Sequence, residues 1–493
     1  MKNKTDDMMD VDPTVQLVVR SRQNVIGRDA VDTKTTEVCA TLQACDLANE
    51  DDDDESRAPV DILVSLDVSG SMAGSKLELC KETLQMLLRQ LKKDDRFGLV
   101  TFSTVAHLHL PLRRLDKKHL RDALDSIRAL RASGATNLSG GIVTAAEELT
   151  RQMGNDNDDQ HRVRSVFLLT DGFANQGVTD ANTLSGIVEN LFSQHPVVGD
   201  RTPRKSPMTM HCFGYGEHHD DTLLRRLSNS TPGGTYYYVQ NDSNVTSAFG
   251  DALGGILSVV AQNVTLHFQV PDEAKHLGVV LEHVYHDKAT DCGDGRFQVQ
   301  LHDLYAEESR DVVCRIRLAN RFPDDGMDDN PSIPHLAVQL TYVDTVRKCL
   351  AKEDAICVID RPKGKTLSAV EEHVAVQALR VEAVREMARA QELSRAGQME
   401  EARARMQRVS LQTRSAAPNV QQHPLVQQLQ GDLDEVQEGM RSVATFRAGG
   451  SKALNSTVQS HEMQRFAASG TGRACVYRSK KKTAMARKFH TMK

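Results

Sequence analysis

Largely apolar strand segments alternate with amphipathic helical segments from Pro59 to Val260, and this alternation constrains the fold more than any other feature of the chain. The segments Val60–Leu66 and Ser165–Thr170 are mostly apolar, as is typical of strands that are covered on both faces. Between them, Lys76–Leu91 places apolar side chains at helical spacing. We therefore predict a doubly wound, mostly parallel α/β sheet over residues 58–260.

A second pattern follows over residues 261–362. Segments such as Asn263–Val270 and His335–Val343 alternate apolar and polar side chains, with Gly, Asp and Pro at the turns, which is typical of an antiparallel β-sandwich. This unit is one or two strands short, so we expect strands within residues 15–49 to pair with it. The α/β domain would then be an insertion in the sandwich, entered through an acidic linker at residues 50–57.

The C-terminal third of the chain favours helices. Residues 367–445 are rich in Ala, Glu, Arg and Gln and predict a helical region, with a hairpin interrupted at Gly397 and a further helix at Leu425–Val443. Both ends of the chain are polar and charged. We predict that residues 1–14 are disordered and that residues 446–493 form a mostly disordered basic tail.

Composition argues against several classes of protein. The chain has 493 residues and a net charge of -6, without the run of about 18 apolar residues that a membrane span needs and without an apolar N-terminal leader. We therefore expect a cytoplasmic protein, with the nucleus as the alternative. Its nine cysteines include no C-x-x-C pair, which argues against a zinc finger or a RING built from local spacing and favours reduced, mostly buried thiols. The basic tail has no interleaved aromatic residues, so no nucleic-acid partner is expected.

Oxygen-bearing side chains follow the predicted strands where they end. The first strand runs into a D-x-S-x-S loop, a threonine precedes a predicted helix, and an aspartate follows a central strand. Open α/β sheets bind ligands at this edge, and hydroxyl and carboxylate ligands suit a hard cation such as Mg²⁺ rather than zinc or copper. The candidate metal-ligating residues are Asp67, Ser69, Ser71, Thr136 and Asp171.

Other interpretations of these segments stay open. The hydroxyls of Ser71 and of Thr136 or Ser139 could cap the helices that follow them, although capping does not explain why two aspartates accompany them. The loop Gly70–Lys76 lacks the spacing of a phosphate-binding P-loop. The run His218–Asp221 favours a capped surface loop over a metal cluster.

The candidate residues, in this order and on these elements, resemble the metal-ion-dependent adhesion site of von Willebrand factor type A (VWA) domains. The resemblance implies that Ser69, Ser71 and Thr136 touch Mg²⁺ directly, with Mn²⁺ or Ca²⁺ as alternatives, while Asp67 and Asp171 act through waters or hydrogen bonds. A cation held mainly by neutral groups keeps an open position, which an Asp or Glu of a partner protein can fill. The rim expected to meet that partner consists of Gly70, Met72, Asn137, Gly172 and Phe173.

A wider resemblance extends beyond this domain. The segments Val370–Ala402 and Ser460–Arg465 are similar to the VWA/Hint-associated (Vwaint) helical module of intracellular VWA proteins, among them plant RING-VWA ubiquitin ligases. The N-terminal residues of this chain contain no zinc-ligand set, so the resemblance does not extend to ligase activity. We expect a non-enzymatic, divalent-cation-dependent protein-binding scaffold. The alternatives are a substrate-recognition component of a ubiquitin-ligase system, with ubiquitin-pathway partners, and a metal-dependent hydrolase, for which the sequence offers no obvious base.

Overall fold

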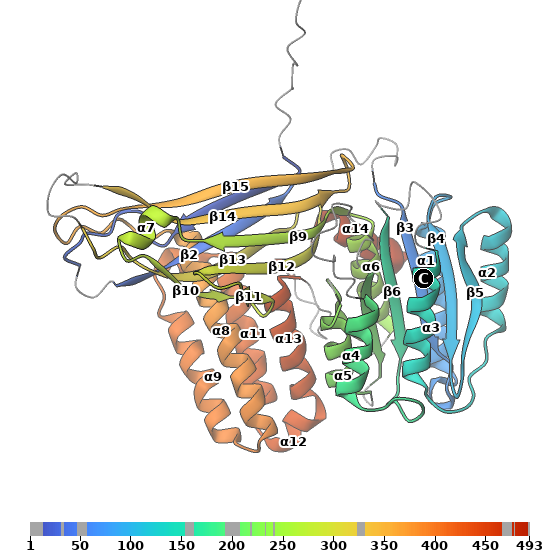
Figure 1. Cartoon of the computed structure of the whole chain (residues 1–493). Helices are drawn as coiled ribbons and strands as arrows, with labels where there is room; N and C mark the ends of the chain where they lie inside the picture. Colours follow the sequence, from blue (N-terminus) through green and yellow to red (C-terminus); the bar gives the residue numbers. More distant parts are fainter. Residues whose placement is uncertain are drawn as a thin grey trace, which may run out of the picture.

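The fold combines an α/β unit, a pair of β-sheets and a group of helices, as the computed structural model in Figure 1 shows. The described residues are 13–30, 34–46, 57–152, 162–192, 208–216, 219–231, 233–239, 242–322, 331–465, 476–477 and 479–491. Nearly all of the segments predicted as a disordered N-terminus and an acidic linker lie outside these ranges. Among the helices within them, none is both long and apolar enough to cross a bilayer.

The α/β unit is built on a six-stranded sheet with the order β5-β4-β3-β6-β7-β8. All neighbouring strands are parallel except the edge strand β5, which is antiparallel to β4. The prediction of a doubly wound, mostly parallel sheet is confirmed. The strands are β3 (Val60–Asp67), β4 (Arg96–Phe102), β5 (Ala106–Arg114), β6 (Val163–Thr170), β7 (Met208–Tyr215) and β8 (Tyr236–Val239).

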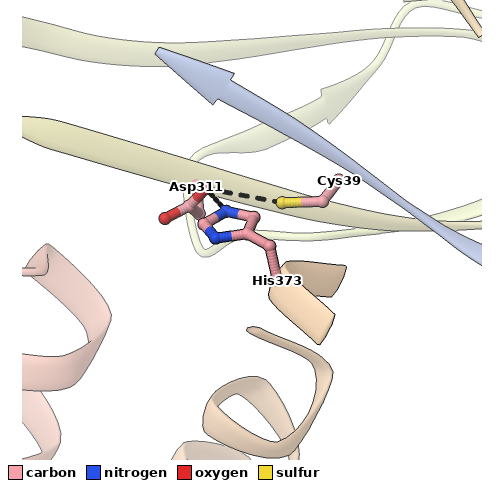
Figure 2. Close-up of side chains that lie close together, drawn as sticks. All are labelled: Cys39, Asp311 and His373. Carbon is pink, nitrogen blue, oxygen red and sulfur yellow. Dashed lines mark hydrogen bonds and ion pairs between the residues drawn. The ribbon is translucent and has the colours of Figure 1, made fainter. Parts of the chain in front are cut away.

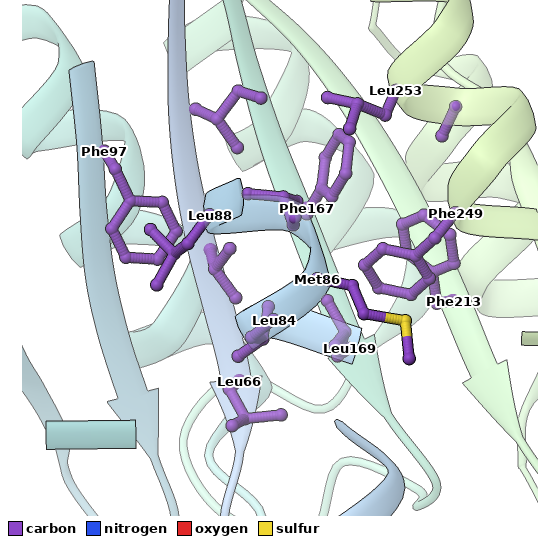
Figure 3. Close-up of a cluster of buried hydrophobic side chains, with 14 of the residues drawn as sticks. Leu66, Leu84, Met86, Leu88, Phe97, Phe167, Leu169, Phe213, Phe249 and Leu253 are labelled. Carbon is purple, nitrogen blue, oxygen red and sulfur yellow. The ribbon is translucent and has the colours of Figure 1, made fainter. Parts of the chain in front are cut away.

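Helices cover both faces of this sheet, which explains why its central strands are buried along their whole length. One face packs against α1 (Ser75–Gln90), α2 (Lys117–Ala129) and α6 (Asp242–Ile256). The other face packs against α3 (Leu138–Arg151), α4 (Ala181–Phe192) and α5 (Asp221–Asn229). Figure 3 shows the first of these two cores, where the rings of Phe213 and Phe249 stack with centroids 4.2 Å apart and Phe167 meets them edge-on or tilted.

Two antiparallel sheets pack around a second core. Their orders are β1-β2-β13-β10 and β11-β12-β9-β14-β15. The N-terminal strand β2 pairs with β13, with Cys39 opposite Val313, so strands from both sides of the α/β unit in the sequence lie in one sheet. The strands are β1 (Val15–Ser21), β2 (Thr35–Ala44), β9 (Val259–Gln269), β10 (Val280–Tyr285), β11 (Ala289–Asp291), β12 (Arg296–Tyr305), β13 (Ser309–Arg317), β14 (Ser332–Asp344) and β15 (Cys349–Asp360).

Most of the remaining helices form a group beneath this pair of sheets (Figure 1). The turn between α8 and α9 contains Gly397 at a φ of +81°, a conformation that glycine adopts without steric cost. The start of α8 contacts β2 and β13, where Val374 packs against Cys39 and Val313. The helices of this group are α8 (Glu372–Arg395), α9 (Met399–Arg414), α10 (Pro418–Gln422), α11 (Pro424–Gly439), α12 (Val443–Thr445) and α13 (Ser451–Met463). The short α7 (Asp272–His276) contacts β14, and α14 (Lys480–Thr491) packs against α6.

The prediction of a mostly disordered tail over residues 446–493 is wrong for the part that the structure describes. This part contains α13 and α14, and α14 packs against α6. The helices approach closely at Gly250, where an added Cβ would lie 2.5 Å from the Cα of Ala486. Lys482 Nζ lies 3.2 Å from the Asp251 carboxylate, and both side chains are buried. The basic sequence suggested a solvated segment. The residues that contact α14, Gly250 and Asp251, lie far away in the chain, so the local sequence did not indicate this packing.

Candidate functional site

The predicted metal-ligating residues lie at the carboxyl ends of two adjacent parallel strands. Asp67 is the last residue of β3, and Asp171 directly follows β6. The loop after β3 forms a short 3₁₀ turn at Gly70–Met72, and Thr136 precedes α3. The amide of Gly70 donates to the carbonyl of Gly134 (3.0 Å), which joins the loop after β3 to the loop before α3.

Asp67 is buried and has both carboxylate oxygens engaged. Its Oδ1 accepts a hydrogen bond from the Ser69 amide (2.8 Å), and its Oδ2 accepts one from the Thr170 hydroxyl (2.6 Å). Burial raises the pKa of Asp67, and the hydrogen bonds from Thr170 and Ser69 act in the opposite direction. This carboxylate therefore joins the loop after β3 to the end of β6.

Ser69, Ser71 and Asp171 form a continuous polar group. The hydroxyl oxygens of Ser69 and Ser71 are 3.1 Å apart, and the Ser71 hydroxyl donates to Asp171 Oδ1 (2.8 Å). Ser71 is exposed, whereas Ser69 and Asp171 are buried. The group is therefore open to solvent on the Ser71 side and supported by protein on the other.

Thr136 completes the group. Its side chain is buried, and its amide donates to Asn175 Oδ1 (2.7 Å). A Cβ added to Gly172 would lie 3.4 Å from Thr136 Oγ1 and 3.6 Å from Ser71 Oγ. The two hydroxyls thus face the same small space beside Gly172, and the structure brings together all five predicted residues.

The capping alternative does not agree with the structure. Helix α3 is capped by Asn137, whose Oδ1 accepts from the Gly140 amide (2.9 Å), so neither Thr136 nor Ser139 is the cap. Helix α1 begins after Gly74 and has no side-chain cap, so Ser71 does not cap it. The hydroxyls of Ser71 and Thr136 are left for the group around Gly172.

The predicted rim is only partly exposed. Phe173 is 57% exposed and Gly70 is exposed, whereas Gly172 and Asn137 are half-buried. Met72 was wrongly placed at the rim, because its side chain is fully buried in the core beneath α1 and α6. The 3₁₀ turn points Met72 inward, while the neighbouring Ser71 stays exposed.

Lys76 was not predicted as part of the site. Its ammonium group forms an ion pair with Asp171 Oδ2 and also donates to the Ser71 carbonyl (3.3 Å). Its position in the first turn of α1, close in sequence to Ser71, is the signal that could have found it. The lysine places a fixed positive charge beside the oxygen atoms that a cation would use.

The segment around the two adjacent histidines is a capped loop on its described side. Asp220 Oδ1 accepts from the Leu223 amide (2.9 Å) and caps α5. His219 is buried and lies 2.6 Å from the Tyr236 hydroxyl. His218 lies outside the described residues.

The fold is an α/β domain of the doubly wound class, in which ligands generally bind at the sheet edge that here gathers these oxygens. A family model for the von Willebrand factor type A domain matches residues 61–251, and this part of the chain is a VWA domain. E3 ubiquitin-protein ligase WAV3 from Arabidopsis thaliana is 27% identical over 270 residues, covering 54% of this chain and 32% of the ligase. The uncharacterized protein YfbK from Escherichia coli (strain K12) is 23% identical over 356 residues, covering 69% of this chain and 56% of that protein. The chain thus spans less than two thirds of either curated relative.

A solved structure extends the similarity of fold beyond the VWA domain. The structure described as a von Willebrand factor type A protein from Catenulispora acidiphila superposes with a TM-score of 0.64 at 15% identity. It covers 92% of this chain and 99% of that chain. The α/β unit, the paired sheets and the helices therefore recur together in another protein.

Proposed function

We propose that the VWA domain binds proteins through a divalent cation held at the carboxyl edge of its sheet. The observation that carries the proposal is the convergence of the Ser71 and Thr136 hydroxyls on the space beside Gly172, with Ser69 and Asp171 adjoining. VWA domains often bind a divalent metal ion at such a site and are generally adhesion or scaffold modules rather than enzymes. We place this chain among them as a scaffold.

The donor set suits Mg²⁺, because every predicted ligand supplies oxygen. Ser69, Ser71 and Thr136 would hold the ion, with Asp171 adjacent and Asp67 holding the loop. The hydroxyls are neutral, so an ion held mainly by them would keep much of its charge. A carboxylate from a partner's Asp or Glu would then complete the shell beside the exposed Phe173.

Calorimetric titration of the full chain with MgCl₂ tests the metal site. Thr136→Ala removes one proposed ligand and is expected to weaken Mg²⁺ binding at least tenfold. Thr150→Ala removes a hydroxyl at the far end of α3, where it donates to the Ala146 carbonyl (2.8 Å), and is expected to bind as the wild type does. Equal affinity of wild type and Thr136→Ala would overturn the assignment of this ligand.

Affinity capture then tests the protein-binding role. Wild type and Thr136→Ala are compared in Mg²⁺ and in EDTA, and a true partner is lost in EDTA and with Thr136→Ala but kept with Thr150→Ala. Replacing acidic residues of a captured partner one at a time should identify the carboxylate that meets the metal. Partners that bind equally in EDTA would contradict the proposed function.

The similarity to the plant ligase favours a second candidate, a substrate-recognition component of a ubiquitin-ligase system. The similarity covers 54% of this chain and 32% of the ligase, and in this candidate another subunit supplies the catalysis. Cation-dependent co-purification with a RING or U-box protein, together with ubiquitin transfer to a captured partner, would support this candidate. Capture of partners without any ubiquitin-transfer protein would argue against this candidate and favour the scaffold function.

A further inference from the structure

A second group of side chains of metal-ligating types lies where α8 meets the paired sheets. It is separate from the group around Gly172 at the carboxyl edge of the VWA sheet, which we call the VWA edge. Among the described residues, Cys39, Asp311 and His373 place a sulfur, an oxygen and a nitrogen within 4.8 Å of one another. Figure 2 shows that the three side chains converge from β2, β13 and the start of α8. They come from sequence positions far apart, and the packing of α8 on the sheet unites them.

The distances between these atoms approach those around a tetrahedral zinc ion. His373 Nε2 lies 2.7 Å from Asp311 Oδ1, and Cys39 Sγ lies 3.5 Å from the same oxygen. Zinc bonds of about 2.3 Å to sulfur and 2.0 Å to nitrogen or oxygen separate tetrahedral ligands by about 3.3–3.6 Å. The Cys39–Asp311 pair already has this spacing, so His373 would need to withdraw by roughly half an ångström. Its side chain is 30% exposed, so protein does not enclose it on every side.

The backbone that carries the central ligand is braced on two sides. The Asp311 amide donates to Gln464 Oε1 (3.0 Å), and its carbonyl accepts from Gln464 Nε2 (2.9 Å). The same carbonyl accepts from Arg380 Nη2 (3.1 Å). Polar partners behind a ligand hold it in place for a metal. The Thr41 hydroxyl, 2.6 Å from Asp311 Oδ1, adds another oxygen beside the group.

The chemistry of the three ligands selects zinc. A thiolate, an imidazole and a carboxylate form the mixed set that Zn²⁺ binds, whereas Mg²⁺ prefers oxygen ligands alone. The thiolate and the carboxylate together balance the charge of the ion. Cys39 would give its thiol proton to solvent on binding, as metal-bound cysteines do.

We propose that Cys39, Asp311 and His373 bind a Zn²⁺ ion that fastens the start of α8 to strands β2 and β13. A water or the Thr41 hydroxyl fills the fourth position. The site is separate from the VWA edge and does not depend on the function proposed there. Its role is to stabilise the contact between the helical region and the paired sheets.

Cobalt(II) titration of the full chain tests the site, because a cobalt–thiolate bond gives a near-ultraviolet charge-transfer band. The VWA edge offers oxygen ligands only, so cobalt bound there does not produce this band. The wild type is expected to show the band at one equivalent and to lose it on addition of ZnCl₂. Cys39→Ser should abolish the band, and His373→Gln should weaken cobalt binding at least about tenfold.

Two controls separate the site from other cysteines and from the VWA edge. Cys349→Ser removes an exposed cysteine at the start of β15 and should keep the band, as should Thr136→Ala. His373→Gln replaces a partly exposed side chain, and its far-ultraviolet circular dichroism without metal verifies folding. Zinc should raise the melting temperature of the wild type but not that of His373→Gln. Absence of the band in the wild type, or its persistence in Cys39→Ser, would overturn the proposal.

Discussion

At the scale of single residues, Lys76 adds a positive charge to the VWA edge. Its ammonium pairs with Asp171, the acid that adjoins the hydroxyls of Ser69 and Ser71. A divalent cation entering this group would meet a positive charge already in place. The side chain is 39% exposed, so solvent weakens the repulsion without removing it.

Replacing Lys76 with methionine is therefore expected to tighten Mg²⁺ binding by about three- to tenfold, since a nearby like charge is removed. Lys76→Arg keeps the charge and serves as the control, with an affinity close to that of the wild type. Calorimetric titration at moderate salt measures both. Unchanged affinity in Lys76→Met would mean that the lysine does not oppose the cation.

Asp303 gives the stability of the protein a defined dependence on pH. Burial raises the pKa of Asp303 to about 7, and the nearby Arg465 only partly opposes the shift. An acid whose pKa is higher in the folded state stabilises the fold below its unfolded pKa of 3.8, and this contribution is lost as pH rises toward 7. Asp303→Asn should therefore gain stability relative to the wild type between pH 4 and pH 8.

Melting temperatures measured across that range test the expectation for Asp303. Glu308→Gln is the informative contrast. Burial alone would raise the pKa of Glu308, but Arg310 and Arg465 outweigh it and lower that pKa to about 2. The ionised Glu308 carboxylate therefore stabilises the folded protein above pH 4.5, and this stabilisation is lost as pH falls toward 2. Glu308→Gln should thus destabilise the protein at neutral pH. A difference between Asp303→Asn and wild type that does not change with pH would contradict the assignment.

At the scale of elements, the contact between α6 and α14 reverses the usual effect of a helix glycine. Replacing glycine with alanine inside a helix normally stabilises it by up to about 1 kcal/mol. At Gly250 the new Cβ would lie 2.5 Å from the backbone of α14. Because backbone cannot give way as a side chain does, Gly250→Ala should cost about 1–3 kcal/mol.

Gly186→Ala in α4 is the matched control for this contact, since an added Cβ there meets nothing within 4 Å. Urea unfolding of both variants, with hydrogen exchange over residues 480–491, measures stability and the docking of α14. Gly250→Ala should speed exchange in α14, and Gly186→Ala should not. Equal stabilisation by both substitutions would show that α14 does not dock as described.

The sequence predicted some of these elements correctly and others not. The largely apolar segment Ser165–Thr170 correctly predicted a buried strand. A strand that is covered on both faces has mostly apolar residues in its own sequence, so the pattern is visible locally. The sequence of α14 alone did not indicate that this helix packs on the protein, since its partners Gly250 and Asp251 lie on another helix. The same distinction applies to Met72, whose inward direction depends on the turn that contains it.

At the scale of the whole molecule, Arg465 joins the α/β unit to the paired sheets. Its buried guanidinium pairs with Glu308 (2.8 Å) and donates to the carbonyls of Gly233 (3.1 Å) and Asp303 (2.8 Å). It also lies over the ring of Tyr305, 3.8 Å from the centroid. One side chain that follows α13 thus bonds residues of both units.

Arg465→Met should destabilise the protein by about 3–5 kcal/mol, because it leaves the Glu308 carboxylate and two carbonyls buried without this partner. Arg441→Met is the control, since that arginine is 74% exposed in its side chain and should change stability by less than about 0.5 kcal/mol. Urea unfolding measures both. A loss below about 1 kcal/mol in Arg465→Met would show that this junction contributes little.

The sequence by itself determined the α/β alternation and the residue types at the VWA edge. The face that each strand or helix buries sets the spacing of its apolar residues, and this spacing can be seen in the sequence. The D-x-S-x-S loop places Asp67, Ser69 and Ser71 within five residues. Only the tertiary structure decided which distant groups meet. It turned Lys76 toward Asp171, docked α14 on α6 and placed Cys39 beside Asp311, 272 positions away. Such contacts depend on how separate elements pack against one another. This packing produces no regular spacing of residues along the chain, so a sequence pattern does not predict it.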